Sequence, residues 1–518
     1  MFRFIRELQK IYKGAEPNKE YEAPSAPLAL SLDVTLTQLR RDFQDSADLT
    51  IRKIRLSSCQ AAVVTIDNMI DKQILAEGIL QPLLSYVFVD TEPTACYQMI
   101  SERVLYTAEL TELTTIEALE EAIMSGLAAI VIDGCDKVMA IGIQGYASRG
   151  VSEPESDIVQ RGSKEGFVES VRVNMTLMRR RLKNPRLKFE TLTLGRTSRT
   201  QIALCYLTDT VSKEILSELK RRLRRIPLDT VLTAGYLVPF LEDGGGHSLF
   251  SGVGVSERPD TVCGKLAEGR IAVLVDGVPS ALIVPYIFAE YFQSLDDYSN
   301  RAYFATFTRF LKYGAFFISI LLPGVFVSLG TYNPEMFPTL MLNKIAASIA
   351  ATPLSLTTET ILILFIYELM REAGLRMPQP LGYAVSIVGG LVIGDTAVSA
   401  GLIGAPTLMV VAISAISSYV VPNLYAPSAV LRMLLTLTGG LFGIWGMAVG
   451  GCVLLVHLCG KSSFGVPYTT PITPMSAIAW RDVLVRADWR ILSHRTERIQ
   501  DLPGAETSRQ EATNDEQP

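Results

Sequence analysis

The sequence predicts an α/β soluble N-terminal half made of two small subdomains, followed by an α-helical polytopic membrane domain. The first observation behind this is that charge is segregated along the chain. The mean hydropathy is +0.27, although 19% of the 518 residues are charged. Only ten of the 48 basic and 53 acidic residues lie between 312 and 460, and 401–431 contains none. The second observation is that helical and strand-like patterns alternate along the first 240 residues, as they do in α/β proteins.

Length and composition divide the chain into five parts, because about three domains are expected at this length and polar segments flank them. We expect a leader or linker at 1–44, an α/β subdomain at 45–150, a second α/β subdomain at 151–265 with a flexible loop at 241–259, a membrane domain at 266–460, and a cytoplasmic C-terminal region at 461–518 that is disordered from about Pro503.

The compartment is predicted from the first residues and from the cysteines. Residues 1–14 are amphipathic and lack the continuous apolar core of a secretory signal peptide, so we expect the front half on the cytoplasmic side. The seven cysteines are odd in number and form no CxxC pair. This usage predicts reduced, structural thiols.

Local patterns predict the elements of each subdomain. The first should contain strands at 61–66, 128–133 and 138–143 and helices at 74–84 and 116–126. Gly134-Cys135-Asp136 separates the last two strands and predicts a hairpin. The second should contain helices at 165–181 and 212–225 and strands at 189–194 and 202–207.

The membrane half is read from apolar stretches of about 18 residues or more, which are long enough to cross the hydrocarbon core. It should open with an interfacial segment at 271–292, broken by Pro279 and Pro285. The crossings are then expected at 311–330, 339–370, 382–401, 404–421 and 430–458.

Basic residues beside these segments predict the cytoplasmic side. They are Arg301, Arg309 and Lys312 before the first span, Arg371 and Arg376 after the return path, and Lys461, Arg481, Arg486 and Arg490 near the C-terminus. Both termini are therefore expected to be cytoplasmic. Five crossings would put them on opposite sides, so one segment, around 389–406, is predicted to be re-entrant and covered by protein or a water-filled cavity.

Three blocks of sequence resemble one known family. They are RGSKEGFVESVRVNMTLMRRRLKNPRLKFETLTLGRTSRTQIALCYL (161–207), the stretch 257–285 that begins ERPDTVCGKLAEGR and is followed closely by 292–338, and LGYAVSIVGGLVIGDTAVSAGLIGAP (381–406) with HLCGKSSFGVPY at 457–468. The family is that of the A subunits of spore germination receptors, the GerA family, and sporulation paralogues share its architecture. The resemblance covers about 160–470 well and 45–150 weakly. It departs from the family pattern at Ser163, where a proline is expected.

The resemblance implies a multi-pass protein of the bacterial endospore inner membrane, in contact with membrane lipid. It implies a transporter-like B subunit and a lipoprotein C subunit as partners. It also implies that the A subunit forms a homo-oligomer with a gated ion-conducting path, whose opening begins germination.

The return path carries the most informative pattern. Five polar residues recur at steps of 4, 4, 3 and 4, which places them on one face of a helix; they are Lys344, Ser348, Thr352, Ser355 and Glu359. This stripe is either the lining of a pore or a helix–helix seam, and the resemblance favours the pore. Continuing the same face brings in Leu362 and Ile366, an apolar collar that is the candidate gate. Pro353 should kink the helix.

Asp395 is a lone acid in the apolar stretch 382–401. An intramembrane acid is a candidate functional residue. The alternative, slightly favoured, is that it pairs with Lys344 or Arg432 for assembly. Glu368, Arg371 and Glu372 are interpreted as the cytoplasmic membrane boundary.

Other functions find little support. The basic runs 179–183 and 220–225 lack interleaved aromatic residues and end predicted helices, and the net charge is −5, so we expect no nucleic-acid partner. With three histidines, no metal-ligand spacing, GGGHS in place of a P-loop and no GxSxG, we expect no catalytic residue, no metal and no cofactor. The alternative function is a secondary transporter with its own substrate site near the broken helix at 389–406, although no internal repeat is apparent.

Overall fold

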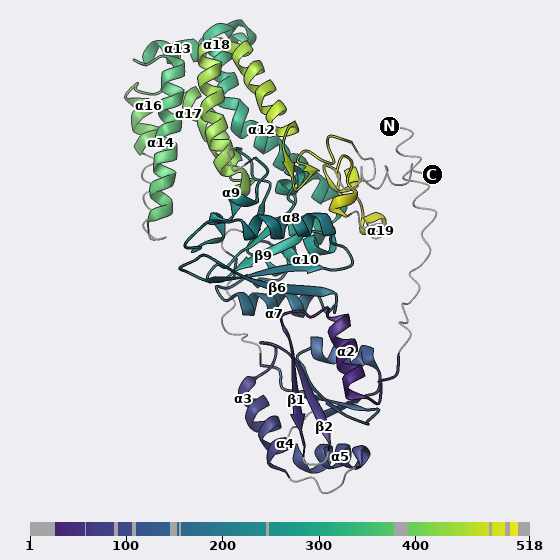
Figure 1. The fold of residues 1–518 in the computed structure, drawn as a ribbon. Helices are drawn as coiled ribbons and strands as arrows, with labels where there is room; N and C mark the ends of the chain where they lie inside the picture. Colours follow the sequence, from purple (N-terminus) through teal and green to yellow (C-terminus); the bar gives the residue numbers. More distant parts are fainter. Residues whose placement is uncertain are drawn as a thin grey trace, which may run out of the picture.

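The protein has two α/β units and a helical part, stacked along one axis (Figure 1). The computed structural model describes residues 26–56, 59–86, 92–105, 110–145, 153–154, 157–244, 248–377, 392–475, 479–492 and 498–505. The first α/β unit lies at the bottom of Figure 1, the second in the middle and the helical part at the top.

The first unit is a five-stranded antiparallel sheet with strand order β1-β2-β4-β5-β3. Its strands are β1 (Leu49–Arg55), β2 (Gln60–Ile66), β3 (Leu110–Leu113), β4 (Leu127–Ile132) and β5 (Val138–Gly142). Helices cover both faces; they are α2 (Leu32–Asp42) and α6 (Ile116–Met124) on one, and α3 (Lys72–Ile74), η1 (Leu75–Leu80), α4 (Gln81–Ser85), α5 (Pro93–Met99) and η2 (Ile100–Val104) on the other.

Double coverage explains the uninterrupted apolar sequence of β2. Ala61 and Val63 face one core and Ala62 and Val64 face the other, as the two-residue period of a strand requires. The predicted strands, helices and hairpin of this subdomain are confirmed. The predicted leader at 1–44 extends too far, because α2 places Leu36 and Leu39 in the core.

The second unit is also a five-stranded antiparallel sheet, with order β6-β7-β9-β10-β8. Its strands are β6 (Leu187–Leu194), β7 (Thr200–Leu207), β8 (Gly254–Ser256), β9 (Ile271–Val275) and β10 (Ala281–Val284). Helices α7 (Val171–Arg181) and α10 (Pro259–Ala267) cover one face; α8 (Lys213–Arg224), η3 (Ala234–Tyr236) and α9 (Val238–Leu241) cover the other. The predicted loop 241–259 thus supplies an edge strand, and its residues 245–247 lie outside the described residues.

The expected interfacial segment at 271–292 is wrong. It forms β9 and β10 of the second sheet, followed by the 3-10 helix η4 (Phe288–Phe292) and α11 (Leu295–Ser299). The five residues Ile271–Val275 are all buried because both faces of this sheet are covered, so their composition imitates a membrane segment. The second α/β unit therefore continues past residue 265.

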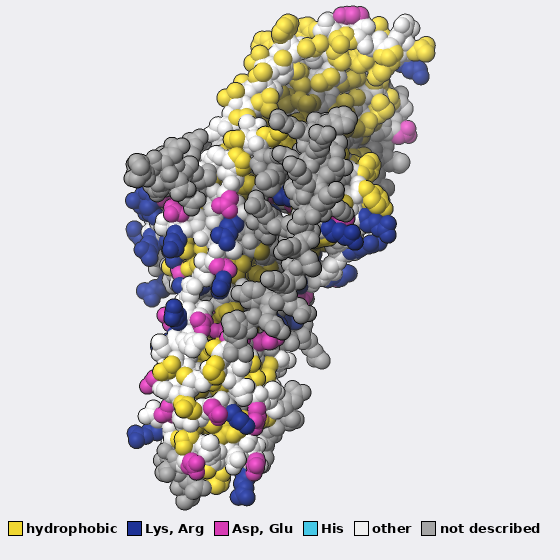
Figure 2. Space-filling view, turned by 90° about the vertical axis from the view of Figure 1, so that its right-hand side faces the viewer, with side chains coloured by type: hydrophobic (Ala, Val, Ile, Leu, Met, Phe, Trp, Pro, Cys, Tyr) yellow, Lys and Arg dark blue, Asp and Glu magenta, His cyan; other side chains and the backbone are white. Residues whose placement is uncertain are grey.

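Among the described residues, two helical segments are long and apolar enough to cross a membrane, α12 (Ala302–Tyr332) and the segment Pro422–Cys459, which a turn described below divides. A third is possible if α13 (Thr339–Ala351) and α14 (Leu356–Arg376) count as one span. The remaining elements among the described residues of this part are η5 (Pro334–Met336), η6 (Val392–Thr396), α16 (Ala397–Ser399), α17 (Ala405–Ser418), η7 (Pro422–Leu424) and α18 (Tyr425–Cys459). Figure 2 shows hydrophobic side chains gathered over this end of the molecule.

The return path 339–370 is not one helix. The axes of α13 and α14 meet at 79° across residues 352–355, where Pro353 cannot donate a helical N–H hydrogen bond. The kink was expected at this proline, but a bend this large removes the single helical face on which the polar stripe was placed.

Helix α18 is a hairpin with its turn at Gly443, whose φ of 63° and ψ of −148° are not helical. A Cβ on Gly446 would lie 2.4 Å from the Thr438 carbonyl oxygen, and one on Gly450 would lie 2.7 Å from Leu435 Cδ2. Residues 438 and 446 would be about 12 Å apart in a continuous helix. The two arms therefore run antiparallel (Figure 1).

The hairpin changes the topology argument. The apolar run 430–458 was expected to cross the membrane once, and this odd number of crossings required one re-entrant segment. If its two antiparallel arms each cross, the expected number of crossings is even and no re-entrant segment is required. Helices α14 and α17 run in the same direction, since Glu359 meets Gly404 and Tyr367 meets Tyr419. Residues 378–391 between them lie outside the described residues, so re-entry at 389–406 stays a prediction.

The C-terminal region returns to the second α/β unit. Its elements are β11 (Ser462–Ser463), β12 (Val466–Pro467), η8 (Ala479–Asp482), α19 (Trp489–Leu492) and η9 (Ile499–Asp501). Buried side chains from it complete the core over one face of the second sheet; they are Phe464, Val466, Ile499, Leu502 and Ala505. Order therefore extends past Pro503 to Ala505, and residues from 506 lie outside the described residues.

Candidate functional site

Glu359 lies at the bend between α13 and α14 and is 1% exposed. Helix α14 begins after Ser355, whose Oγ accepts the N–H of Thr358 at 3.3 Å, so Glu359 lies in the first turn of this helix. Its Oε1 accepts the backbone N–H of Gly404 at 2.8 Å, and its Oε2 accepts the Thr352 hydroxyl at 3.4 Å. Among the described residues no cation pairs with this carboxylate.

Gly404 is the N-cap of α17, and polar side-chain atoms lie close to it. A Cβ here would lie 2.5 Å from Ser348 Oγ, 3.2 Å from Glu359 Oε1 and 3.6 Å from Thr407 Oγ1. The carboxylate is thus placed near the N-terminal ends of both α14 and α17, where partial positive charge stabilises an anion. Hydroxyl and carboxylate oxygens of four residues converge at this point: Ser348, Thr352, Glu359 and Thr407.

The structure brings only part of the predicted stripe together. Ser348, Thr352 and Glu359 meet, whereas Lys344 and Ser355 are exposed. The 79° bend is the cause, because residues on either side of it no longer share a helix. Thr407 and Gly404 were missed by the sequence analysis, since they come from another helix.

The candidate gate residues lie on the outer side of α14. Leu362 is 40% exposed and Ile366 is half-buried. The apolar layer inside the protomer is made by neighbouring residues that the sequence analysis did not select; they are Ile363 and Leu364 of α14 with Ile403 and Val411. Leu362 therefore faces away from the core of the helical part.

Asp395 is exposed within η6. The expected pairing with Arg432 is wrong, because the fully buried Arg432 pairs with Glu368 instead. Glu368 also accepts hydrogen bonds from Tyr425 Oη at 2.7 Å and from Arg371 Nε at 3.3 Å. Glu368 therefore joins two helices of the bundle and is more than a boundary residue. Among the described residues, neither Asp395 nor Lys344 has an ion-pair partner.

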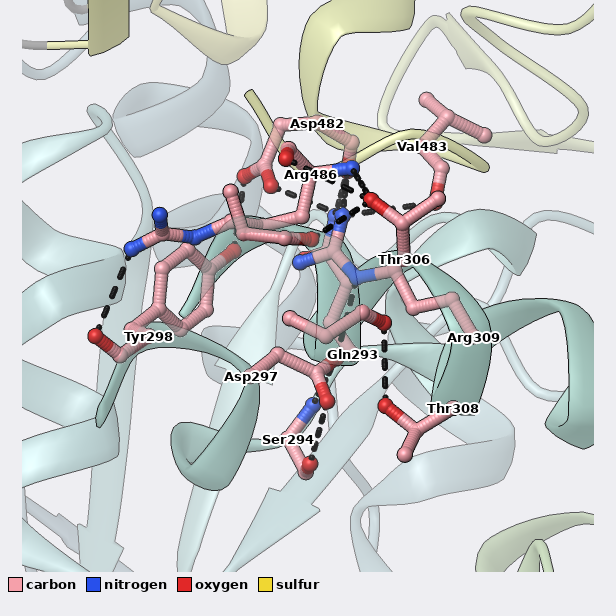
Figure 3. Close-up of polar contacts among 12 residues, drawn as sticks. Gln293, Ser294, Asp297, Tyr298, Thr306, Thr308, Arg309, Asp482, Val483 and Arg486 are labelled. Carbon is pink, nitrogen blue, oxygen red and sulfur yellow. Dashed lines mark hydrogen bonds and ion pairs between the residues drawn. The ribbon is translucent and has the colours of Figure 1, made fainter. Parts of the chain in front are cut away.

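A second polar cluster lies where α12 leaves the α/β unit (Figure 3). The fully buried Arg309 donates from Nε to Asp297 Oδ2 at 2.9 Å and pairs through Nη1 with Asp482 Oδ1 at 2.8 Å. Lys312 Nζ lies 3.1 Å from Asp297 Oδ1, and Tyr298 Oη donates to Asp482 at 2.7 Å. Arg309 and Lys312 are thus neutralised internally, which weakens their value as markers of the cytoplasmic side.

The basic runs are likewise used inside the protein. Arg179 is fully buried and donates to both oxygens of Asp48, at 2.9 and 3.0 Å, which joins α7 to the first α/β unit. Arg222 pairs with Glu218 and Asp243. These two arginines therefore do not belong to a solvated basic face. Among the described residues no group of three or more His, Cys, Asp or Glu side chains is placed to hold a metal ion.

Comparison with known proteins assigns the chain to a family. The family model for the Bacillus/Clostridium GerA spore germination protein matches residues 37–498. Spore germination protein KA of Bacillus subtilis is 34% identical, over 90% of this chain and 87% of the relative. Spore germination protein GerLA of Bacillus cereus is 33% identical, over 91% of this chain and 97% of the relative.

One solved structure is also similar, the N-terminal domain of the A subunit of the Bacillus megaterium spore germinant receptor GerK3. It is 25% identical, with a TM-score of 0.40, over 51% of this chain and 98% of that chain. With a family model that spans most of its length, this chain belongs to the GerA family of spore germination proteins.

Proposed function

We propose that this protein is the A subunit of a spore germinant receptor, with a transporter-like B subunit and a lipoprotein C subunit as partners. In this role it oligomerises in the endospore inner membrane, with both termini cytoplasmic, and forms a gated ion-conducting path that starts germination. The names of its relatives support the role in germination. The path is argued from Glu359.

The buried carboxylate of Glu359 is the observation that carries the proposal. An acid among apolar membrane helices is costly unless it is paired or used. Here its described partners are one N–H and one hydroxyl, so negative charge is left for a passing cation. Leu362 follows within one turn and its exposed side chain can meet its copies in a ring. A narrow ring of leucines stays dewetted and closed.

The test uses substitutions at Glu359 and Leu362 and measures protein abundance and ion release in the same spores. Glu359→Gln keeps the hydrogen-bonding shape but removes the charge, so it should change which cations pass. Leu362→Ser should wet the collar and release ions without a stimulus. Glu372→Gln, an exposed acid of the same helix, is the matched control. Stable Leu362→Ser and Leu362→Ala proteins that do not leak would rule out the gate.

A secondary transporter is the second candidate, and one observation favours it. The interruption between α13 and α14 at 352–355 lies against the interruption between α16 and α17 at Gly401–Gly404. Paired discontinuous helices often bind transported solutes and ions. The two candidates differ in kinetics. A transporter in vesicles should show saturable counterflow of one solute, whereas a channel should show ion flux that does not saturate in this way.

A further inference from the structure

The ion pair between Glu368 of α14 and Arg432 of α18 has no part in the proposed ion path. Arg432 is fully buried in the helical part, and its Nη2 pairs with Glu368 Oε1. A buried charge pair of this kind seldom adds net stability over apolar residues, but breaking it by removing one partner is strongly destabilising. Its presence therefore points to a need for specific placement.

The pair fixes the end of α14 that points toward the α/β units (Figure 1). Around it, Tyr425 Oη donates to Glu368 Oε2 at 2.7 Å, and Tyr367 Oη donates to Tyr419 Oη at 2.9 Å. Arg371 lies over the Tyr425 ring, 3.9 Å from its centroid. The partners of α14 at this end thus come from α18 and from the end of α17.

The opposite end of α14 is held by Glu359 on Gly404. Between the two carboxylates, Ile363 and Leu364 pack against Ile403 and Val411. Because lipid is as apolar as these side chains, the hydrophobic effect gives little preference for one rotation of the helix. The two carboxylates therefore set the rotation of α14, and with it the direction in which Leu362 points.

We propose that Glu368 and Arg432 are positioning residues that form a latch, which holds α14 in the closed orientation of the gate until germination separates them. This inference rests on the proposed function, because it assumes that α14 carries the gate. A latch of opposite charges works in either polarity, whereas a packing role depends on the shape of each side chain.

The first experiment compares Glu368→Gln, Arg432→Glu and the double exchange Glu368→Arg with Arg432→Glu, again with Glu372→Gln as control. Abundance and ion release without a stimulus are measured for each. We expect Glu368→Gln, which keeps the shape of the side chain, to accumulate and to release ions several-fold faster than the unchanged protein. Arg432→Glu places two acids together and should be the most defective variant, and the exchange should restore both abundance and ion retention. The latch is overturned if Glu368→Gln spores retain their ions normally. It is also overturned if the double exchange releases ions as fast as Arg432→Glu does. If the single variants fail to accumulate, the exchange alone decides in the same way.

A second measurement separates the latch from the ion path itself. Leu362→Cys is introduced into a protein in which the exposed Cys452 and Cys459 are replaced by serine, and thiol labelling is timed with and without Glu368→Gln. A released α14 should change the labelling rate several-fold. If Glu368→Gln changes the labelling rate but causes no ion release, the latch on α14 holds and the proposed gate is refuted. If the labelling rate is unchanged, the latch is refuted.

Discussion

Carboxylates that are buried or half-buried in this protein have different neighbours. Glu359 relies on an N–H group and a hydroxyl at two helix N-termini, and Glu368 on a buried arginine. Glu120 of α6 has another acid, Asp42, as its neighbour. Burial and the Asp42 carboxylate raise the pKa of Glu120 to about 7 from its ordinary value of 4.5, so Glu120 is protonated in the folded unit below pH 7.

The first prediction follows from this pKa. Because the folded state binds the proton more tightly than the unfolded state, the first α/β unit should lose stability as pH rises from about 4.5 to about 7. The full shift corresponds to about 3 kcal/mol, and solvent screening of this half-buried group reduces the expected loss to on the order of 2 kcal/mol. Hydrogen exchange of the α2 and α6 amides in the full-length protein measures this. Asp42→Asn removes the neighbouring charge and should flatten the dependence. An equally steep dependence in that variant would exclude Asp42 as a cause.

Single elements show where the sequence was informative. Strands β2 and β4 and helix α6 were predicted because their periods are simple and local. Strand β9 was not, since a strand buried on both faces has the composition of a membrane segment. The hairpin in α18 was missed because glycines are common in membrane helices, and nothing local marks Gly443 as the turn.

The second prediction concerns that turn. Gly443→Ala should destabilise the helical part by about 1–3 kcal/mol, because its positive φ is strained for any residue with a Cβ. The added Cβ would also lie 3.0 Å from the Tyr332 ring. Gly451→Ala is the control, since a Cβ there meets nothing within 4 Å. Thermal unfolding in detergent should show a lower Tm for Gly443→Ala only; equal Tm values would argue against a strained turn.

The candidate site was partly predictable for a related reason. Glu359 and its hydroxyl neighbours on α13 were found from their spacing, which is a property of one segment. Gly404 and Thr407 are 45 or more residues away along the chain, and only the fold brings them to the carboxylate. The same holds for Glu368 and Arg432, which sequence spacing does not connect.

The whole molecule depends on buried charges where its parts meet. Arg179 on Asp48 joins the two α/β units, and Arg309 on Asp297 and Asp482 joins α11, α12 and the C-terminal region. These joints make the stacked arrangement of Figure 1 specific.

The third prediction tests the first of these joints. Arg179→Leu leaves Asp48 buried without its partner and should cost about 3–5 kcal/mol. Arg172→Ala, on the same helix, removes an exposed pair with Asp67 and should cost less than about 1 kcal/mol. Hydrogen exchange at β1 and α7 in the full-length protein reports both. Equal, small effects would show that the units are joined by other contacts.

The core of the second α/β unit has a consequence for biosynthesis. Strand β7 is made early, but Ile499, Leu502 and Ala505, which cover its sheet, are among the last described residues to leave the ribosome. Domains otherwise tend to fold one after another as they emerge. This one must wait, with an apolar face uncovered, while the helices between its two halves are synthesised. Completion of the soluble fold thereby requires that the whole helical part has already left the ribosome.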